Sequence, residues 1–141
     1  MKKYFFLLIV FPMLFGCTAD RINNNNPYIP NYSFAVEINM NLPSYSILLS
    51  PGNGIYYPNQ GVRGLFVFYT GSGYMAFDAA CPNQALSSCS TMTIDSDGIN
   101  AVCPCDNAKY LLYTGQSTGK EYPMKQYRVQ IVGNNLLRVY N

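Results

Sequence analysis

The chain has 141 residues, of which nine are Lys or Arg and seven are Asp or Glu, so its formal net charge at pH 7 is +2. It contains no histidine, which excludes a histidine general base and a Ser–His nucleophile pair. The charges form no basic stripe, so nucleic-acid binding has no electrostatic support.

Residues 1–16 have the features of an export signal. Two lysines are followed by the apolar segment Tyr4–Phe15, which is too short to span a bilayer. The segment ends with Gly16 directly before Cys17, which resembles the lipobox of bacterial lipoproteins. The resemblance implies that Cys17 is lipidated and becomes the first mature residue. The alternative is an ordinary secretory signal in which this cysteine stands by chance.

The segment after Cys17 is predicted to be a tether. Residues 17–31 contain four consecutive asparagines and two prolines and have too little apolar content to pack, so we expect a flexible connection between lipid and domain. Surface-exposed lipoproteins of some Gram-negative groups carry an acidic cluster at this point, whereas here Asp20 stands alone. This favours a lipid-anchored protein of the bacterial cell envelope, at the outer membrane and facing the periplasm.

Residues 32–141 are predicted to form one all-β domain. Apolar and polar residues alternate over 34–38, which is typical of a strand. Further strands are expected at 45–49, 55–57, 64–69, 74–77, 91–94, 99–102, 110–113, 127–131 and 136–140. The segment 64–69 is nearly all apolar or aromatic, which predicts burial on both faces. Many short strands and no sustained helical period predict a small antiparallel barrel or sandwich.

Four of the five cysteines lie in two loops of this domain. Cys81 and Cys89 belong to the first loop, and Cys103 and Cys105 belong to the second. Two cysteine loops on a β-scaffold indicate either a metal site or a pair of disulfides, and an exported chain meets oxidising conditions in which disulfides persist. The sequence alone leaves three disulfide connectivities open.

The order of these motifs resembles Rieske-type iron–sulfur domains. The segment 74–82 is similar to the entry of the family's first cluster loop, and 102–105 with 109–115 is similar to its second loop and the following strand. The segment 122–139 is similar to the closing hairpin. The resemblance spans residues 61–141 and implies a Rieske-like domain with both cysteine loops at one tip.

The histidine ligands of the family are replaced here. Rieske domains hold a two-iron cluster with one cysteine and one histidine from each loop. Cys81 and Cys103 stand at the cysteine positions, but Asn83 and Asp106 stand at the histidine positions. An amide oxygen is a poor iron ligand and a carboxylate is harder than imidazole. The resemblance therefore implies a degenerate site that does not assemble the ordinary Rieske centre, and we expect no metal or cofactor.

The resemblance also implies how the thiols pair. Higher-potential members of the family carry an extra cysteine in each loop, joined by a disulfide; Cys105 stands at one of these positions and Cys89 close to the other. Without a cluster, Cys81 and Cys103 face each other, so the implied disulfides are Cys81–Cys103 and Cys89–Cys105. The alternatives are zinc or a two-iron cluster on four thiolates, and thiol–disulfide exchange at Cys103-Pro104-Cys105.

No arrangement of residues indicates an enzyme. Asp95 and Asp97 stand in a turn and are interpreted as turn formers, and Asp78 is expected to hydrogen-bond the loop backbone before Cys81. We therefore expect an envelope lipoprotein with a cluster-less Rieske-like domain in a structural or interaction role, with another envelope protein as its partner. The alternatives are electron transfer by an unusually ligated iron–sulfur centre and glycan binding through tyrosines.

Overall fold

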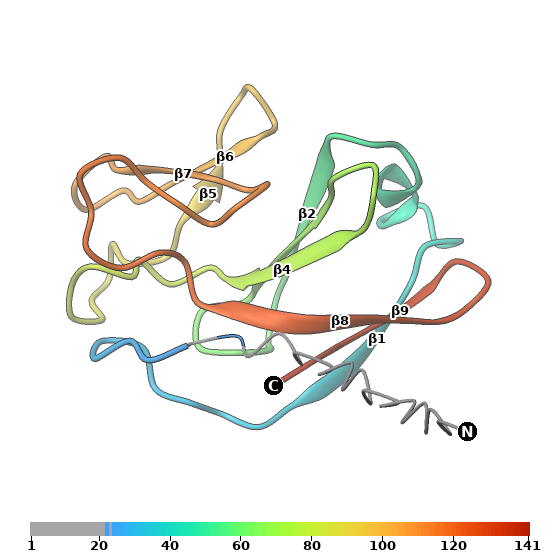
Figure 1. Ribbon diagram of the computed structural model, residues 1–141, viewed down its shortest axis with the longest axis horizontal. Helices are drawn as coiled ribbons and strands as arrows, with labels where there is room; N and C mark the ends of the chain where they lie inside the picture. The colour runs from blue at the N-terminus through green and yellow to red at the C-terminus, as the bar shows by residue number, and fades with distance from the viewer. Residues whose placement is uncertain (1–21, 23) are drawn as a thin grey trace, which may run out of the picture.

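The computed structural model describes residue 22 and residues 24–141 (Figure 1). The predicted signal segment and Cys17 lie outside the described residues. The described chain forms nine β-strands and one short 3₁₀ helix, η1, so the all-β prediction is confirmed. In this part of the chain no helix has the length and apolar character needed to cross a membrane.

The strands form two antiparallel sheets. The six-stranded sheet has the order β1-β9-β8-β4-β3-β2. Its strands are β1 (Ala35–Asn39), β2 (Asn53–Tyr57), β3 (Leu65–Tyr69), β4 (Tyr74–Asp78), β8 (Gln126–Gly133) and β9 (Leu136–Tyr140). The three-stranded sheet has the order β5-β6-β7 and consists of β5 (Thr93–Ile94), β6 (Asn100–Val102) and β7 (Lys109–Leu111). The first four residues of β3 are buried, as its apolar sequence predicts.

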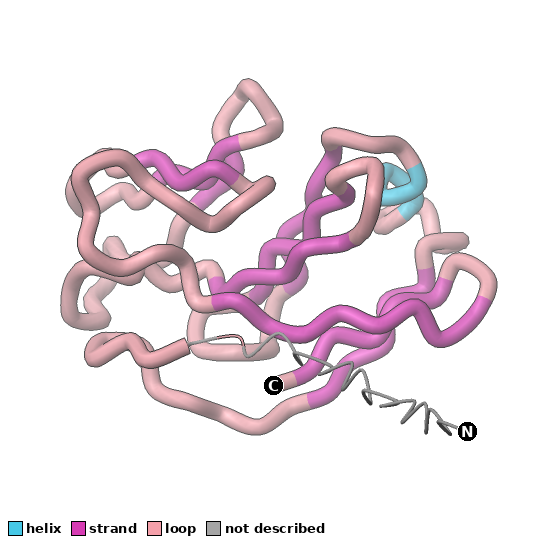
Figure 2. The backbone as a smooth tube through the Cα atoms, in the orientation of Figure 1, coloured by secondary structure: helices cyan, strands magenta, loops and turns pink. Residues whose placement is uncertain are grey.

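The small sheet is an excursion from the large one. The chain leaves the large sheet after β4, builds β5 to β7, and returns at β8. Figure 1 shows the small sheet at one end of the molecule and the β8–β9 turn at the other, and Figure 2 shows the long loops around the small sheet. One cysteine loop connects β4 to β5 and the other connects β6 to β7. The prediction that both loops lie at one tip is therefore confirmed.

Two apolar clusters stabilise the two parts. One lies within the large sheet and includes Ile38, Leu65 and Tyr127, all buried. The other joins the large sheet to the small one and includes Phe77, Tyr110, Cys81 and Cys103. Because the buried cysteines belong to this second cluster, the cysteine tip is part of the core of the domain.

The strand expected at 45–49 is wrong. Residues Ser46–Leu49 form η1, drawn in cyan in Figure 2. The amide of Ser46 donates to the carbonyl of Leu42 at 3.0 Å, so the backbone bonds locally rather than to a neighbouring strand. Only Leu48 of this apolar run is buried, and the prolines at 43 and 51 leave too short a segment for a ladder.

The predicted tether is corrected for residues 24–31, here named the N-terminal strap, which packs against the domain. The Asn24 side chain donates to the carbonyl of Gln126 and accepts from its amide at 3.0 Å. Asn26 donates to the carbonyl of Pro82 at 2.8 Å, and Ile29 is 2% exposed. Asparagine amides carry a donor and an acceptor side by side, so they satisfy backbone groups as a strand would. Composition alone did not reveal this.

Candidate functional site: the two cysteine loops

A buried carboxylate positions the first cysteine loop. Asp78 ends β4, is fully buried, and accepts hydrogen bonds from the amides of Val62 at 2.6 Å, Arg63 at 3.2 Å and Ala80 at 2.8 Å. The Tyr127 hydroxyl donates to it at 2.7 Å. Burial, and then the adjacent Asp78 charge, raise the pKa of Tyr127 far above its usual value, so this hydroxyl stays a donor. The predicted structural role of Asp78 is confirmed.

Two disulfides join the loops. Cys81 bonds to Cys103 across a Cα separation of 5.6 Å, and both residues are 1% exposed. Cys89 bonds to Cys105 across a Cα separation of 5.2 Å, and Cys89 lies at the surface. These are the two pairings that the resemblance implied. The Sγ atoms of Cys81, Cys103 and Cys105 all lie within 4.8 Å of one another.

The amide at the first histidine position is occupied by structural hydrogen bonds. Asn83 Nδ2 donates to the Tyr110 hydroxyl at 2.9 Å and to the carbonyl of Tyr122 at 2.7 Å. Asn83 Oδ1 accepts from the amide of Tyr122 at 2.9 Å. The side chain therefore pairs with the Tyr122 backbone as one strand pairs with another. It connects the first loop to the segment that precedes β8.

The carboxylate at the second histidine position is also held within the protein. Asp106 accepts from Lys120 Nζ at 2.7 Å and from the amide of Ala108 at 3.1 Å. Desolvation raises the pKa of Asp106, but the Lys120 and Ala108 hydrogen bonds outweigh it, so the pKa lies below the usual range. Asp106 therefore stabilises the second loop as a carboxylate.

The residues present do not fit a Rieske centre. Such a cluster needs two thiolates and two imidazoles that project towards the irons. Here the two sulfurs at those positions are bonded to each other, the donors of Asn83 are used by Tyr110 and Tyr122, and Asp106 is paired with Lys120. A tetrahedral thiolate site fits no better, because among the described residues three sulfurs converge and not four.

The turn at the far end of the small sheet has the structure that its sequence predicts. Asp97 Oδ1 accepts from the amides of Ile99 at 2.9 Å and Asn100 at 3.0 Å. Asp95 pairs with Lys109 at 2.5 Å, an exposed ion pair. Both aspartates are turn formers.

Gly115, the last residue of the second sequence motif, is required by its surroundings. Its φ is +74°, and a Cβ there would lie 2.6 Å from the Phe77 ring. Its amide donates to the carbonyl of Leu111 at 2.7 Å, and its carbonyl accepts from the amide of Met124 at 2.8 Å. Gly115 therefore turns the chain from β7 towards the segment that leads to β8.

Sequence reasoning missed two features near this tip. Tyr127 was predicted only as a strand residue, yet its hydroxyl donates a hydrogen bond to Asp78. Lys125 was not singled out, yet it is 2% exposed and donates to Asn31 Oδ1 at 2.9 Å. Evidence in the sequence that Lys125 is buried was weak, namely its place between Met124 and the first residue of β8. Its ammonium is buried because the N-terminal strap packs over it.

Comparison with known proteins gives structural likeness only. No family model matches the sequence, and no curated protein matches it. One similar solved structure is a complex of reduced oxygenase and oxidized ferredoxin in carbazole 1,9a-dioxygenase, with a TM-score of 0.48 and 20% identity over 77% of this chain and 92% of that one. A second is the ferredoxin of carbazole 1,9a-dioxygenase from Nocardioides aromaticivorans IC177, with a TM-score of 0.46 and 16% identity over 77% and 97% of the two chains.

A third is a protein assigned as the NADH-dependent nitrite reductase small subunit of Mycobacterium tuberculosis, with a TM-score of 0.47 and 14% identity over 79% of this chain and 97% of that one. At these scores and identities the three structures support no statement about what this chain does. Its own structure has the expected antiparallel all-β character and the two cysteine loops at one tip, and it divides the strands into a six-stranded and a three-stranded sheet. The chain is therefore an all-β domain whose two disulfide-joined cysteine loops lie at one tip.

Proposed function

We propose that this protein is a lipid-anchored cell-envelope domain that carries no iron–sulfur cluster and acts in a structural or protein-interaction role. The observation that supports it is the use of all four cluster positions inside the protein. Cys81 and Cys103 are bonded to each other, and Asn83 and Asp106 hold neighbouring segments of the chain. A cofactor would have to break these interactions before it could bind.

The N-terminal strap sets how far the domain extends from the anchor. With lipid on Cys17 and packing from residue 24 onward, only the seven residues 17–23 span the gap. A fully extended chain covers about 3.3–3.6 Å per residue, so the domain stays within roughly 25 Å of the membrane. This short reach favours a partner that is itself at the envelope surface.

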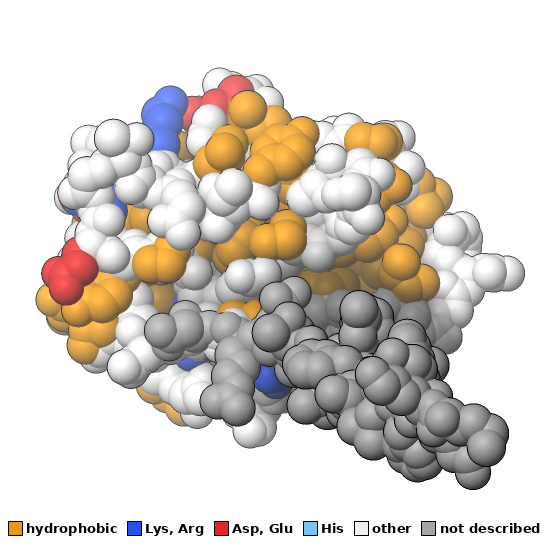
Figure 3. All heavy atoms as spheres, viewed as in Figure 1, with side chains coloured by type: hydrophobic (Ala, Val, Ile, Leu, Met, Phe, Trp, Pro, Cys, Tyr) orange, Lys and Arg blue, Asp and Glu red, His pale blue; other side chains and the backbone are white. Residues whose placement is uncertain are grey.

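Exposed apolar side chains support a protein partner. Leu42, Ile47 and Leu49 are 49%, 50% and 44% exposed within one eight-residue segment around η1. The face drawn in Figure 3 also has hydrophobic side chains gathered over β2 and β4, with few charges. Apolar surface that is grouped in this way is typical of contact surfaces between proteins.

Electron transfer is the second candidate, and one observation favours it. Three cysteine sulfurs lie within 4.8 Å of one another, which a thiolate-held metal would require after reduction of the disulfides. The fourth ligand would have to come from Cys89 or from Asp106, and each is engaged elsewhere. The geometry supports this candidate less well.

One preparation tests both candidates. The full chain, with its leader, is expressed in a Gram-negative host, extracted from membranes without oxygen and measured for iron, zinc, visible absorbance and disulfides by non-reducing peptide mapping. We expect no stoichiometric metal, no visible absorbance, and peptides linked through Cys81–Cys103 and Cys89–Cys105. Stoichiometric iron with a coloured protein would replace the first proposal with the second.

The anchor is tested separately with a clickable fatty acid. Wild-type protein should incorporate the label and fractionate with the outer membrane, and Cys17→Ser should lose both properties. A labelled Cys17→Ser variant, or an unlabelled wild-type protein, would contradict the lipoprotein assignment while leaving the result on the cluster intact.

A further inference from the structure

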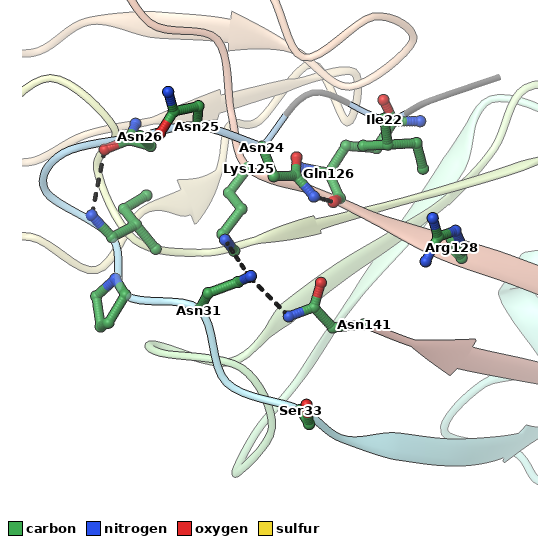
Figure 4. Close-up of a pocket in the computed structure, with 12 residues that line it drawn as sticks. Ile22, Asn24, Asn25, Asn26, Asn31, Ser33, Lys125, Gln126, Arg128 and Asn141 are labelled. Carbon is green, nitrogen blue, oxygen red and sulfur yellow. Dashed lines mark hydrogen bonds between the residues drawn. The ribbon is translucent and has the colours of Figure 1, made fainter.

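A polar pocket lies beneath the N-terminal strap, distant in the sequence from the cysteine loops. It has a volume of about 570 Å³, which is within the range of small-molecule sites. Its walls come from three parts of the chain: the strap and residues just after it, the start of β8, and the residue that follows β9. Figure 4 shows these side chains around the opening. The polar residues used below are Asn24, Asn31, Lys125, Gln126, Arg128 and Asn141.

A buried lysine without an ion pair lines this pocket. Lys125 is 2% exposed, and its Nζ donates to Asn31 Oδ1 at 2.9 Å. Within the described chain the ion pairs are Lys109–Asp95 and Lys120–Asp106, so Lys125 has none there. A buried ammonium with no ion pair among the described residues is costly and rare, and its three protons can serve three acceptors.

The other described lining residues are mostly polar, Ile22, Ile29 and Pro30 being the apolar exceptions, and none of them is acidic. Arg128 contributes a guanidinium from β8. Asn31 Oδ1 also accepts from Asn141 Nδ2 at 2.9 Å. Two cations and several amide side chains, with no acidic side chain among the described lining residues, form a surface that attracts negative charge.

Burial lowers the pKa of Lys125, and the Asp78 charge partly opposes this. The buried ammonium has lost favourable interactions with water. A bound anion would compensate for this loss, since an opposite charge stabilises the protonated form of lysine. The Asn24 side chain, which holds the strap to Gln126, fixes one wall of the pocket without using Lys125 or Arg128.

We propose that this pocket binds a small oxyanion, a carboxylate or a phosphate group, between Lys125 and Arg128. Lys125 supplies hydrogen bonds from a desolvated ammonium, and Arg128 supplies the planar fork that matches two oxygens of the ligand. The Asn31 amide adds a further polar contact, whereas Asn141 Nδ2 already donates to Asn31 Oδ1 at 2.9 Å and to the carbonyl of Tyr32 at 2.7 Å and so braces the wall. None of the described lining residues is a cysteine or stands at a cluster position.

The test uses isothermal titration of the full chain with inorganic phosphate, citrate and glucuronate at low ionic strength, with glucose as the uncharged probe. We expect saturable binding of at least one oxyanion with a dissociation constant below about 1 mM. Phosphate binding without citrate or glucuronate binding would identify a phosphate ligand, and the reverse a carboxylate. Absence of saturable binding for all three, or equal binding of glucose, would overturn the proposal.

Three variants locate the site. Arg128→Gln should weaken binding about tenfold or more, because a hydrogen bond to a charged group is lost. Arg138→Gln is the matched control, since Arg138 is an exposed arginine on the adjacent β9 and does not line the pocket. Asn31→Asp places a carboxylate on Lys125 without changing side-chain size, so it should abolish binding while thermal stability is kept. Equal effects of Arg128→Gln and Arg138→Gln would refute a specific site.

Discussion

The two disulfides are expected to contribute unequally to stability, although their loops are of similar length. Cys81–Cys103 spans 22 residues and Cys89–Cys105 spans 16. The loss of loop entropy in the unfolded chain is worth about 3 kcal/mol for either loop. The difference comes from burial: Cys81 and Cys103 lie in the apolar cluster that joins the two sheets, whereas Cys89 is exposed.

Replacing each pair by alanine separates the two contributions. The variant with both Cys89→Ala and Cys105→Ala should lose about 3 kcal/mol of unfolding free energy. The variant with both Cys81→Ala and Cys103→Ala should lose about 5 kcal/mol, because removal of two buried sulfurs adds about 1 kcal/mol each. For a domain that is stable by about 5–15 kcal/mol, the second loss is a large fraction of the total.

Urea unfolding followed by far-UV circular dichroism measures these free energies. In thermal unfolding of the same variants, we expect the melting temperature to fall by about 4 °C for each kcal/mol lost, and so by about 12 °C when the Cys89–Cys105 disulfide is removed. Ser87→Ala is the control for loop effects: its hydroxyl contacts Cys89 Sγ at 3.3 Å on the surface, and its loss should cost less than about 0.5 kcal/mol. If the two double variants are equally stable, or both match the wild type, the reasoning from loop length and burial is refuted.

Three further predictions concern the residues that position the loops. Gly115→Ala should cost about 2–4 kcal/mol by chemical denaturation, whereas Gly119→Ala, with a similar φ of +73° and nothing near its Cβ, should cost about 1 kcal/mol; equal losses would refute the steric argument. Asp78→Asn should cost about 2–4 kcal/mol in the same assay, because the new amide NH₂ would face N–H and O–H groups that also donate. A loss below about 1 kcal/mol would show that the Asp78 carboxylate does not hold these segments together. The lowered pKa of Asp106 predicts that its contribution is present above its unfolded pKa of about 3.9 and is lost as pH falls through the lower folded pKa. Asp106→Asn should therefore flatten the fall in stability below about pH 4, and an unchanged dependence of stability on pH in this range would show that the bond to Lys120 does not contribute.

Local patterns determined most of the secondary structure. Alternation and apolar runs placed β1, β3, β4, β8 and β9, because a strand needs a residue pattern that matches its pleat and its burial. The prediction at 45–49 failed because an apolar pattern alone does not provide a neighbouring strand to pair with. An apolar run without a neighbouring strand forms the local hydrogen bonds that it can reach, and here those bonds form η1.

The cysteine tip was predictable because its residues are close in the sequence to the strands that carry them. Cys81 follows the end of β4 after two residues and Cys103 follows β6 directly, so the order of strands brings them together. Replacement of both histidine positions was visible in the sequence as well. The partners that hold Asn83 were not, since Tyr110 and Tyr122 are 27 and 39 residues away from it.

The tertiary structure alone decided the role of the N-terminal strap and of Lys125. Four asparagines beside prolines predicted a solvated tether. Composition measures how much apolar surface a segment can bury, but not which backbone groups its side chains can hydrogen-bond. The contact between Asn24 and Gln126 joins residues 102 positions apart, and the contact between Asn31 and Lys125 joins residues 94 positions apart. Pairing at that distance depends on how the sheet folds back on itself, so the pocket exists only in the folded chain.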